Sequence, residues 1–549
     1  MSAWNDMMCN LLLLRRCTTA CLALLGTIAS AQPQTPSADL IVYGGTASGV
    51  ITAYTAAKQG YKVVLLEPGG HLGGMVTGGL SATDTAYFPI IGGYAREFYR
   101  QAAAHYNVHT LSRHDDWLSE PHVGEEIFQR WLKDAGVEIQ LHERLSEKRG
   151  VSRHGTHLLS IETEDGKRWA GKVFADCTYE GDLMAQAHVR YTVGREGMEV
   201  YKEDLAGVRT ETPLHQFQWK IAGRDAHGRL LPEIGAQPMG TQGAGDRKVQ
   251  AYNFRLILTD DPANRLPWAM PKGYDGRRFD LLAEYLQQWK THKGKDPGFR
   301  DVTNPVMIPH RKADFNNQGA FSTDYLGKSW TYPDANYAER QRIWDDHMLY
   351  TQSFFWFLAS DPRVPKSLRD EANQWGRAKD EFADSDHWPS QLYIREGRRM
   401  IGQYVMRESD LQTDRVKPDS IAMGSYNSDS HNVQRVLLPD GSVRNEGDVQ
   451  VPVRPYEIAF GAMIPQRDQT DNLLVPVCLS ASHVAYSSVR MEPQYMMIGQ
   501  AAGDTAVLAL RSGKSVANVS IPQLQQMLHA QGAILHLSER SPEGPEPPR

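Results

Sequence analysis

The sequence is poor in cysteine, and this shortage argues against several kinds of site. Only five of the 549 residues are cysteine. Cys9, Cys17 and Cys21 fall in the N-terminal segment, and the other two, Cys177 and Cys478, are 301 residues apart. Such spacing gives no disulfide framework, no metal-binding motif and no close redox-active pair. We expect Cys177 and Cys478 to be spectator thiols, and we expect no metal site.

Long apolar runs and excess basic charge are also missing. Beyond the N-terminal segment, no stretch reaches the roughly 20 apolar residues of a transmembrane helix, so we expect no stable membrane insertion. Lysine and arginine total 59 against 65 aspartate and glutamate, giving a formal net charge of −6. This balance does not indicate a nucleic-acid partner. The length exceeds a single compact core and predicts two or three domains.

Residues 1–31 have the pattern of an export signal. Arg15 and Arg16 precede a short apolar run that ends in Ala29-Ser30-Ala31, a small-x-small cleavage pattern. We therefore expect a signal peptide over residues 1–31 and a periplasmic or secreted protein. The arginine pair also suits the twin-arginine export route. An uncleaved membrane anchor is the alternative interpretation.

A strand–turn–helix–strand pattern follows this segment. Asp39-Leu40-Ile41-Val42-Tyr43 is continuously apolar after its first residue, which is typical of a buried parallel strand. The turn Gly44-Gly45-Thr46-Ala47-Ser48-Gly49 leads into an alanine-rich helix, and a second apolar strand ends at Glu67-Pro68. The order of these elements predicts a dinucleotide-binding unit.

Each part of the unit has a physical role. Gly44 permits a tight turn, and Gly49 lets the helix pack closely on the strand. The helix N-terminus presents free N–H groups to a pyrophosphate, and Glu67 accepts hydrogen bonds from ribose hydroxyls. Thr46 replaces the usual middle glycine, which is a departure from the motif. The predicted cofactor-binding residues here are Gly44, Gly45, Thr46, Ala47, Ser48, Gly49, Glu67 and Pro68.

A second glycine-rich loop follows at once. It reads Gly69-Gly70-His71-Leu72-Gly73-Gly74-Met75, and Thr77-Gly78-Gly79 comes next. A nicotinamide-dependent enzyme does not need this loop. It suits a backbone that lies against a second part of a long cofactor, and it adds His71, Leu72, Gly73, Gly74 and Met75 to the predicted cofactor-binding residues.

With these motifs the sequence resembles the FAD-dependent oxidoreductases of the glutathione-reductase structural class. The likeness is to a secreted bacterial branch, in which some relatives carry the label xanthan lyase although lyase chemistry does not require FAD. The matching stretches cover most of the chain after the signal: Val42–Gly49, Glu67–Gly79, Phe174–Asp182, Gly424–Val433 and Asn472–Gly503. The resemblance implies FAD as cofactor.

The resemblance also implies the fold and further site residues. The fold is expected to be α/β, with a discontinuous Rossmann-type FAD-binding domain at 38–190 and 445–520 and an inserted α+β substrate or cap region at 191–444. Asp176 is implied where the chain returns to the cofactor domain. Gly499, Ala501 and Ala502 are implied on a helix whose start faces the flavin ring. For His71, a covalent flavin link and a backbone-positioning role both remain open.

The middle of the chain gives weaker patterns. Residues 334–360 predict a long helix with Ile343, Tyr350 and Phe354 on one buried face, and residues 250–258 predict a strand. Residues 391–406 predict a second helix carrying Arg395, Arg398 and Arg399, which form either a solvated face or a cluster that recognises an anionic substrate. Proline-rich residues 537–549 are expected to be disordered.

Catalytic candidates lie just before the terminal helix. By resemblance His483 and Tyr486 lie near the flavin, and either could act as general base, while Arg490 could hold a carboxylate or stabilise negative charge. The sequence thus favours hydride transfer between flavin N5 and an organic small-molecule or saccharide substrate, with an unknown electron acceptor. The sequence contains no second glycine motif for a nicotinamide cofactor. The alternative is a non-redox, lyase-like enzyme in which flavin is structural or absent.

Overall fold

The computed structural model describes residues 37–212 and 214–542. The expected signal peptide at 1–31 lies outside these ranges. Within them, no helix combines the length and the hydropathy that crossing a lipid bilayer requires. The fold is α/β, with a mixed Rossmann-like sheet and a separate antiparallel sheet.

The mixed sheet has the strand order β3-β2-β1-β6-β5-β4, and β20 also pairs with β6. Strands β3, β2, β1, β6 and β20 run parallel, whereas β5 and β4 are antiparallel to their neighbours. Their bounds are β1 Ser37–Tyr43, β2 Val63–Glu67, β3 Glu138–Leu141, β4 Val151–His154, β5 His157–Glu162, β6 Arg168–Asp176 and β20 Leu473–Leu474.

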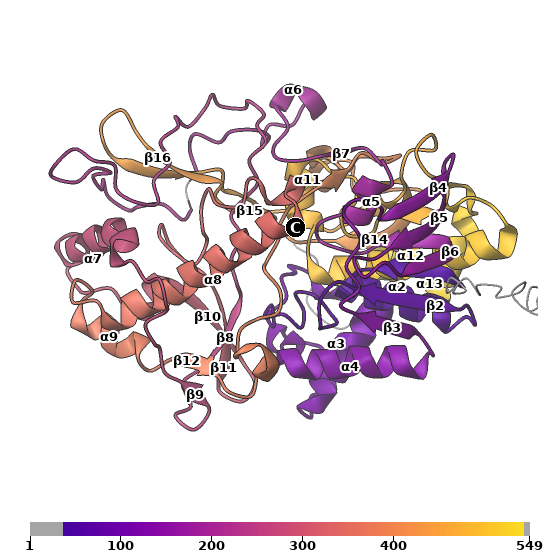
Figure 1. The fold of residues 1–549 in the computed structure, drawn as a ribbon, viewed down its shortest axis with the longest axis horizontal. Helices are drawn as coiled ribbons and strands as arrows, with labels where there is room; N and C mark the ends of the chain where they lie inside the picture. The colour runs from indigo at the N-terminus through magenta and orange to yellow at the C-terminus, as the bar shows by residue number, and fades with distance from the viewer. Residues whose placement is uncertain (1–36, 213, 543–549) are drawn as a thin grey trace, which may run out of the picture. The chain divides into compact units, whose positions relative to one another are not determined.

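Strand β1 is the predicted buried strand, and residues 40–43 are at most 1% exposed. Helix α2 (Ala47–Ala57) follows it and packs along α12 (Glu492–Ser512), as Figure 1 shows for the indigo and yellow helices. The two helices are close because α12 carries glycines at the contact. A Cβ on Gly499 would lie 2.4 Å from the Ser48 carbonyl oxygen, and one on Gly503 would lie 2.6 Å from Thr55 Cβ.

The terminal part of the chain completes the same sheet. Strand β20 pairs with the C-terminal half of β6, with Leu473 opposite Phe174 and Leu474 opposite Ala175. The Asn472 side chain fixes this register by bonding to the main chain of Leu158 and Lys172 at 2.9 Å. Residues that are 299 positions apart therefore meet in one sheet.

The antiparallel sheet comes from the middle of the chain and has the order β10-β11-β8-β12-β9. Its strands are β8 Leu256–Thr259, β9 Arg265–Leu266, β10 Thr303–Ile308, β11 Lys312–Asn317 and β12 Gly376–Ala378. The strand expected at 250–258 begins later than predicted. The long helix expected at 334–360 is α8 (Tyr337–Ser360), and the residues of its predicted stripe are buried.

Shorter elements complete the described ranges. Paired short strands are β7 Tyr191–Thr192 with β13 Arg399–Met400, β14 Ser420–Gly424 with β19 Tyr456–Ala459, β15 Ser428–Ser430 with β18 Val449–Val451, and β16 Gln434–Leu437 with β17 Val443–Glu446. The other α-helices are α3 Gly93–His105, α4 Pro121–Asp134, α5 Asp182–Gln186, α6 Met198–Tyr201, α7 Asp280–Lys293, α9 Lys366–Ala372, α10 Glu408–Gln412, α11 His483–Val489 and α13 Ile521–Ala530.

Residues 391–406 do not form the expected helix. The segment is irregular apart from β13, and its arginines are buried: Arg395 is 1% exposed, Arg398 7% and Arg399 0%. Each is neutralised by a carboxylate of another segment or of its own loop, so the run is neither a solvated face nor a free anion-binding cluster. Tertiary ion pairs override the helical pattern here.

The start of the segment expected to be disordered is described. Leu537–Glu539 form a 3-10 turn in which Glu539 Oε2 accepts the N–H of Leu535 at 2.9 Å. Residues 543–549 of that segment lie outside the described ranges.

Candidate functional site

The turn between β1 and α2 leaves no room for side chains at two positions. Gly44 has a φ of +98°, and a Cβ on it would lie 2.8 Å from Thr178. A Cβ on Gly49 would lie 1.9 Å from the Gly44 carbonyl oxygen. With glycine at both positions, α2 begins directly against the end of β1. The unpaired N–H groups of its first turn are then available to an anion at this edge of the sheet.

Thr46 stands at the position where the motif usually has its middle glycine, and its side chain caps the N-terminus of α2. Its Oγ1 accepts the Gly49 N–H at 3.3 Å and donates to the Cys177 carbonyl at 2.7 Å. Because both bonds turn the hydroxyl into the protein, threonine fits this turn without blocking it. Ala47 and Ser48 follow in the first turn of α2 and are fully buried.

Glu67 ends β2 beside the turn, as predicted for a ribose-binding acid. Its Oε2 accepts the Gly45 N–H at 2.6 Å, and its Oε1 accepts the Gly69 N–H at 2.5 Å. Burial raises the pKa of this carboxyl to about 7, although these two bonds act to lower it. Each carboxylate oxygen has a further lone pair, so Glu67 can still accept hydroxyl groups.

A cavity of about 290 Å³ opens at the C-terminal ends of β1, β2 and β6. Tyr43, Gly44, Thr46, Glu67 and Pro68 line its sheet side. In open α/β sheets this edge is where ligands bind. The volume lies near the lower end of roughly 300–1,000 Å³ that small-molecule sites occupy.

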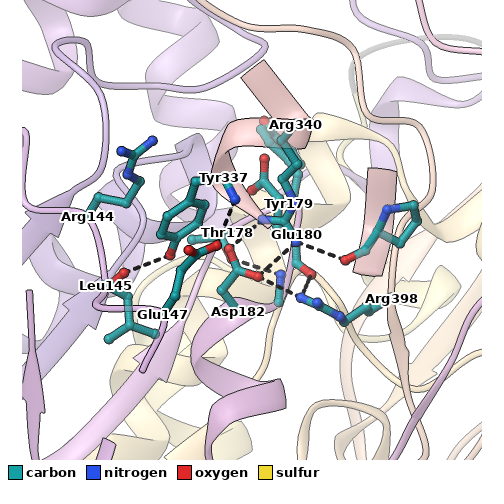
Figure 2. A network of polar contacts seen from close by, with 12 residues as sticks. Arg144, Leu145, Glu147, Thr178, Tyr179, Glu180, Asp182, Tyr337, Arg340 and Arg398 are labelled. Atoms are coloured by element: carbon teal, nitrogen blue, oxygen red, sulfur yellow. Dashed lines mark hydrogen bonds and ion pairs between the residues drawn. The ribbon is translucent and has the colours of Figure 1, made fainter. Parts of the chain in front are cut away.

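Side chains from distant segments also line this cavity. Figure 2 shows the polar contacts that several of them make. Asp182, the first residue of α5, accepts two bonds from Arg340 of α8 at 2.6 and 2.9 Å and one from Arg398 at 2.6 Å. Burial acts to raise the pKa of Asp182, but the two guanidinium groups outweigh it and lower that pKa. This network ties the middle of the chain to the end of β6.

An aromatic ring lines the same cavity. The Tyr337 hydroxyl donates to the Leu145 carbonyl at 2.8 Å, and the Arg144 guanidinium lies 4.3 Å from the ring centroid (Figure 2). A fixed ring beside a nucleotide crevice can stack on a base. The sequence reasoning missed Arg144, Tyr337 and Arg340, because nothing local distinguishes them from ordinary surface residues.

The second glycine loop leads away from the cavity. A further space of about 40 Å³ lies between Thr46, Gly74 and Gln391. Gly74 has a φ of +56°, and a Cβ on it would lie 2.5 Å from the Tyr179 hydroxyl, which accepts the Met75 N–H at 2.9 Å. The loop backbone is therefore packed against Tyr179, which also lines the cavity.

The His71 imidazole is held by two carboxylates. Its Nδ1 lies 3.2 Å from Glu125 and its Nε2 lies 3.3 Å from Asp384. The bond to Glu125 raises the pKa of His71. Leu72 and Gly73 follow, with the Leu72 N–H donating to Glu125 at 3.1 Å and the Gly73 N–H to the Gly45 carbonyl at 2.7 Å.

Four other predicted cofactor-binding residues are engaged within the protein. Asp176 accepts bonds from Thr178 and from the Met184 N–H at 2.7 Å, and burial raises its pKa to about 6. Gly499 packs against α2, and Ala501 and Ala502 are fully buried in α12. These residues shape the helix and strand behind the crevice.

The first residue of α12 is a buried acid that the sequence reasoning did not single out. Glu492 is 3% exposed, and its Oε1 accepts the Tyr179 hydroxyl at 2.7 Å. Its Oε2 has no hydrogen-bond partner among the described residues. Burial raises the pKa of Glu492 to about 8. A chain of bonds thus runs from the Met75 N–H through Tyr179 to an incompletely satisfied carboxyl group.

Two of the three catalytic candidates are bonded to protein groups. His483 Nδ1 lies 2.8 Å from Glu396 and its Nε2 lies 3.2 Å from the Ser430 hydroxyl. Tyr486 donates to the Val477 carbonyl at 3.1 Å and lies 2.8 Å from the Tyr495 hydroxyl.

Arg490 differs from these two because it is incompletely satisfied. It donates to the Tyr393 hydroxyl at 2.9 Å and to the Asp429 carbonyl at 2.7 Å. Its Nε has no partner among the described residues although the side chain is 2% exposed. It therefore keeps a donor for a ligand beside the start of α12.

One group in the described ranges has the geometry of metal ligands, namely Glu120, His122 and Glu381. The Lys312 ammonium lies 2.5 Å from Glu120 Oε1 and 2.6 Å from Glu381 Oε1. Both carboxylates of this group are thus already paired with a buried cation.

The crevice residues fit a dinucleotide. A Cβ would clash at both key glycines of the turn, an acid ends β2, and the glycine loop continues along the wall toward the unpartnered oxygen of Glu492. These residues could hold the adenosine and diphosphate of FAD, with the flavin toward the start of α12.

Comparisons with known proteins agree with this geometry. The family model described as FAD dependent oxidoreductase matches residues 39–528. No curated protein matches the chain at a significant level.

Solved structures resemble only parts of the chain. A flavin-containing monooxygenase from Stenotrophomonas maltophilia is 16% identical over 30% of this chain and 43% of its own, with a TM-score of 0.19. L-proline dehydrogenase from P. horikoshii is 12% identical over 30% of this chain and 59% of its own, with a TM-score of 0.22. In both cases the match spans less than two thirds of the other protein. Because the family model covers most of the sequence, the chain belongs to the FAD-dependent oxidoreductase family, with FAD as its cofactor.

Proposed function

We propose that this oxidoreductase takes hydride from a carbon beside oxygen or nitrogen in a small organic or carbohydrate-like substrate. One observation carries the proposal. The nucleotide crevice continues along the glycine loop to Tyr179 and Glu492, where buried polar atoms lack partners. Unsatisfied polar groups beside a cofactor crevice are expected where a substrate binds.

Bound FAD supplies the two-electron acceptor, and side chains of the chain supply binding and proton transfer. Arg490 and Tyr393 orient the substrate through the free Nε and the hydroxyl. His483, paired with Glu396 at 2.8 Å, is the proposed proton acceptor, and Tyr486 is the alternative. Burial of this region excludes water and strengthens each of these contacts.

We further propose the division of the chain that the resemblance implies. Residues 38–190 and 445–520 hold the cofactor, and 191–444 cover the substrate. The pairing of β20 with β6 and the origin of the antiparallel sheet in residues 256–378 support this division. The arginine pair and cleavage pattern in residues 1–31 support export to the periplasm or beyond.

The test is an anaerobic screen of FAD-loaded protein against alcohols, polyols, sugars and amines, followed by absorbance of the oxidised flavin. We expect at least one of these substrate classes to bleach the flavin absorbance. A protein that binds FAD but is not bleached by any class would contradict the proposed hydride transfer. If the protein that binds FAD without bleaching cleaved an acidic polysaccharide, the lyase-like alternative would replace the proposed hydride transfer.

A further inference from the structure

The His71 side chain joins the glycine loop to two other segments. Its Nδ1 lies 3.2 Å from Glu125 Oε2 in α4, and its Nε2 lies 3.3 Å from Asp384 Oδ2. Asp384 belongs to the 3-10 turn Ala383–Ser385, which comes from the middle of the chain. Each ring nitrogen of His71 therefore faces a carboxylate oxygen. We call His71, Glu125 and Asp384 the histidine clamp.

This geometry requires the imidazolium form of the ring. An ionised carboxylate can only accept hydrogen bonds, whereas a neutral imidazole has a single N–H group to donate. Glu125 acts as an acceptor here, because its Oε1 also accepts the Leu72 N–H at 3.1 Å. Only the imidazolium can donate to Glu125 and Asp384 at the same time. In a neutral His71, one ring nitrogen would direct a lone pair at a carboxylate.

The charges around His71 favour the imidazolium. The hydrogen bond to Glu125 raises the pKa of His71 above its ordinary value of 6.5, and the charges of Asp384 and Glu67 raise it further. Burial acts to lower this pKa but does not reverse the shift. Glu67, at the end of β2, lines the same small space as His71. His71 therefore keeps its proton to a higher pH than an ordinary histidine.

The clamp joins two segments that line the cofactor crevice. His71 and Gly74 of the glycine loop line the space of about 40 Å³, and Gln391 lines it from the segment that follows Asp384. Gln391 also lines the larger cavity. A Cβ on Gly78 would lie 2.6 Å from Gln391 Cβ, so the two segments are packed against each other. Loss of the contact between His71 and Asp384 would loosen this part of the crevice.

We propose that Asp384 is a positioning residue that holds the glycine loop on FAD through the imidazolium of His71. FAD then dissociates more slowly while His71 is protonated, because protonation favours the closed arrangement of the loop, which binds the cofactor better. Both ring nitrogens are occupied in this arrangement, which favours a positioning role of His71 over a covalent flavin link. The inference goes beyond the proposed substrate oxidation, since it concerns retention of FAD when no substrate is present.

The experiment measures how fast FAD leaves the loaded protein in the absence of substrate. FAD-loaded protein is diluted at about pH 5.5 and at about pH 9, on either side of the ordinary histidine pKa of about 6.5. The fluorescence of the released FAD gives the dissociation rate. Burial raises the pKa of Glu67 to about 7, so this acid also ionises within the range. Because Glu67 is present in the wild type and in each variant, the comparison between them isolates the clamp.

Two substitutions of Asp384 distinguish the clamp from a merely structural contact. In Asp384→Asn, the amide can donate to Nε2 of a neutral His71 while Nδ1 still donates to Glu125, so the contact no longer needs the second proton. The rise in dissociation rate from acid to alkaline pH should be about three to ten times larger in the wild type than in Asp384→Asn, a modest factor because the Asp384 side chain is 67% exposed. Asp384→Ala removes the contact and should release FAD faster than the wild type at acid pH.

Asp386→Asn is the matched control. Asp386 lies two residues further along the same segment, its side chain is 88% exposed, and its Oδ2 lies 3.5 Å from Arg377 Nη1. The dissociation rate of this variant and its pH dependence should match those of the wild type. Acid precipitation of the FAD-loaded wild type gives a second reading, because FAD that is not covalently bound should remain in the supernatant.

Three results would overturn the inference. They are an equal change with pH in the wild type and in Asp384→Asn, an Asp384→Ala variant that releases FAD no faster than the wild type at acid pH, and FAD that stays in the acid precipitate. The substrate screen is independent of these results. A protein that releases FAD as expected but is not bleached by any substrate class would reject the proposed hydride transfer and leave the clamp in place.

Discussion

The nucleotide end and the flavin end of the proposed cofactor site are built differently. At the nucleotide end, backbone does the shaping: Gly44 and Gly49 are needed because a Cβ would meet neighbouring atoms at 2.8 and 1.9 Å. At the flavin end, side chains do it: Tyr179 meets Glu492 from a distant segment, and Arg490 Nε and Glu492 Oε2 have no partner among the described residues. The first end depends on local steric fit, the second on long-range electrostatics.

The difference teaches where each kind of change should act. A methyl group added to the turn blocks backbone approach and leaves no alternative packing. A changed charge at the flavin end alters protonation while the crevice remains. The following predictions test this contrast, from the largest expected effect to the smallest.

Gly49→Ala should abolish retention of FAD. The added Cβ would lie 1.9 Å from the Gly44 carbonyl oxygen, so the turn must open. The measurement is the flavin-to-protein absorbance ratio after desalting, with circular dichroism to verify folding. Gly298→Ala is the control, because the nearest atom to its new Cβ is at 3.5 Å. A folded Gly49→Ala protein that stays fully yellow would refute the placement of the diphosphate.

Glu492→Gln should change how stability of the FAD-free protein depends on pH. The pKa of Glu492 is raised from 4.5 to about 8 in the folded state, so the folded protein binds a proton that the unfolded chain releases between these values. Stability of the wild type therefore falls as pH rises through this window, by at most about 1.4 kcal/mol per pH unit from this group.

Glutamine cannot release a proton, and its amide oxygen can still accept the Tyr179 hydroxyl. The variant should therefore lose less stability than the wild type between the two ends of the window, by a few kcal/mol as an order of magnitude. Thermal unfolding at both ends measures this difference. Parallel pH curves for the two proteins would show that Glu492 is ionised throughout.

Tyr337→Ala should weaken FAD binding about tenfold, because it removes the ring from the cavity wall. Tyr337→Phe keeps the ring and loses only the bond to the Leu145 carbonyl, so it should bind FAD nearly as well as the wild type. Fluorescence titration of the FAD-free proteins measures both affinities. Equal FAD affinities for all three proteins would show that the adenine base of FAD does not stack on Tyr337.

Thr46→Gly should have the smallest effect. It restores the usual middle glycine but removes the helix cap and the bond to the Cys177 carbonyl. We expect about 1 kcal/mol lower free energy of unfolding and unchanged FAD content. Denaturant unfolding measures the free energy of unfolding, and the flavin-to-protein absorbance ratio measures the FAD content. Loss of FAD from this variant would mean that the threonine contacts the cofactor directly.

Sequence patterns succeeded where contacts are local. The stripe of Ile343, Tyr350 and Phe354 predicted α8, because helical periodicity depends on neighbours within a few residues. They failed at residues 391–406, where Arg395, Arg398 and Arg399 suggested a helix. The partners of Arg395 and Arg398 are Asp324 and Asp182, which are far away in sequence, so no local pattern could reveal that these arginines are buried.

The sequence by itself determined the strand, the turn and the acid of the proposed dinucleotide site, because their geometry is set by residues close along the chain. Only the tertiary structure decided which side chains face one another across the crevice. Asp182 meets Arg340, and Tyr179 meets Glu492, through folding that joins segments more than 150 residues apart. The electrostatic effect of each pair exists only after that folding, since it depends on distances that the linear sequence does not contain.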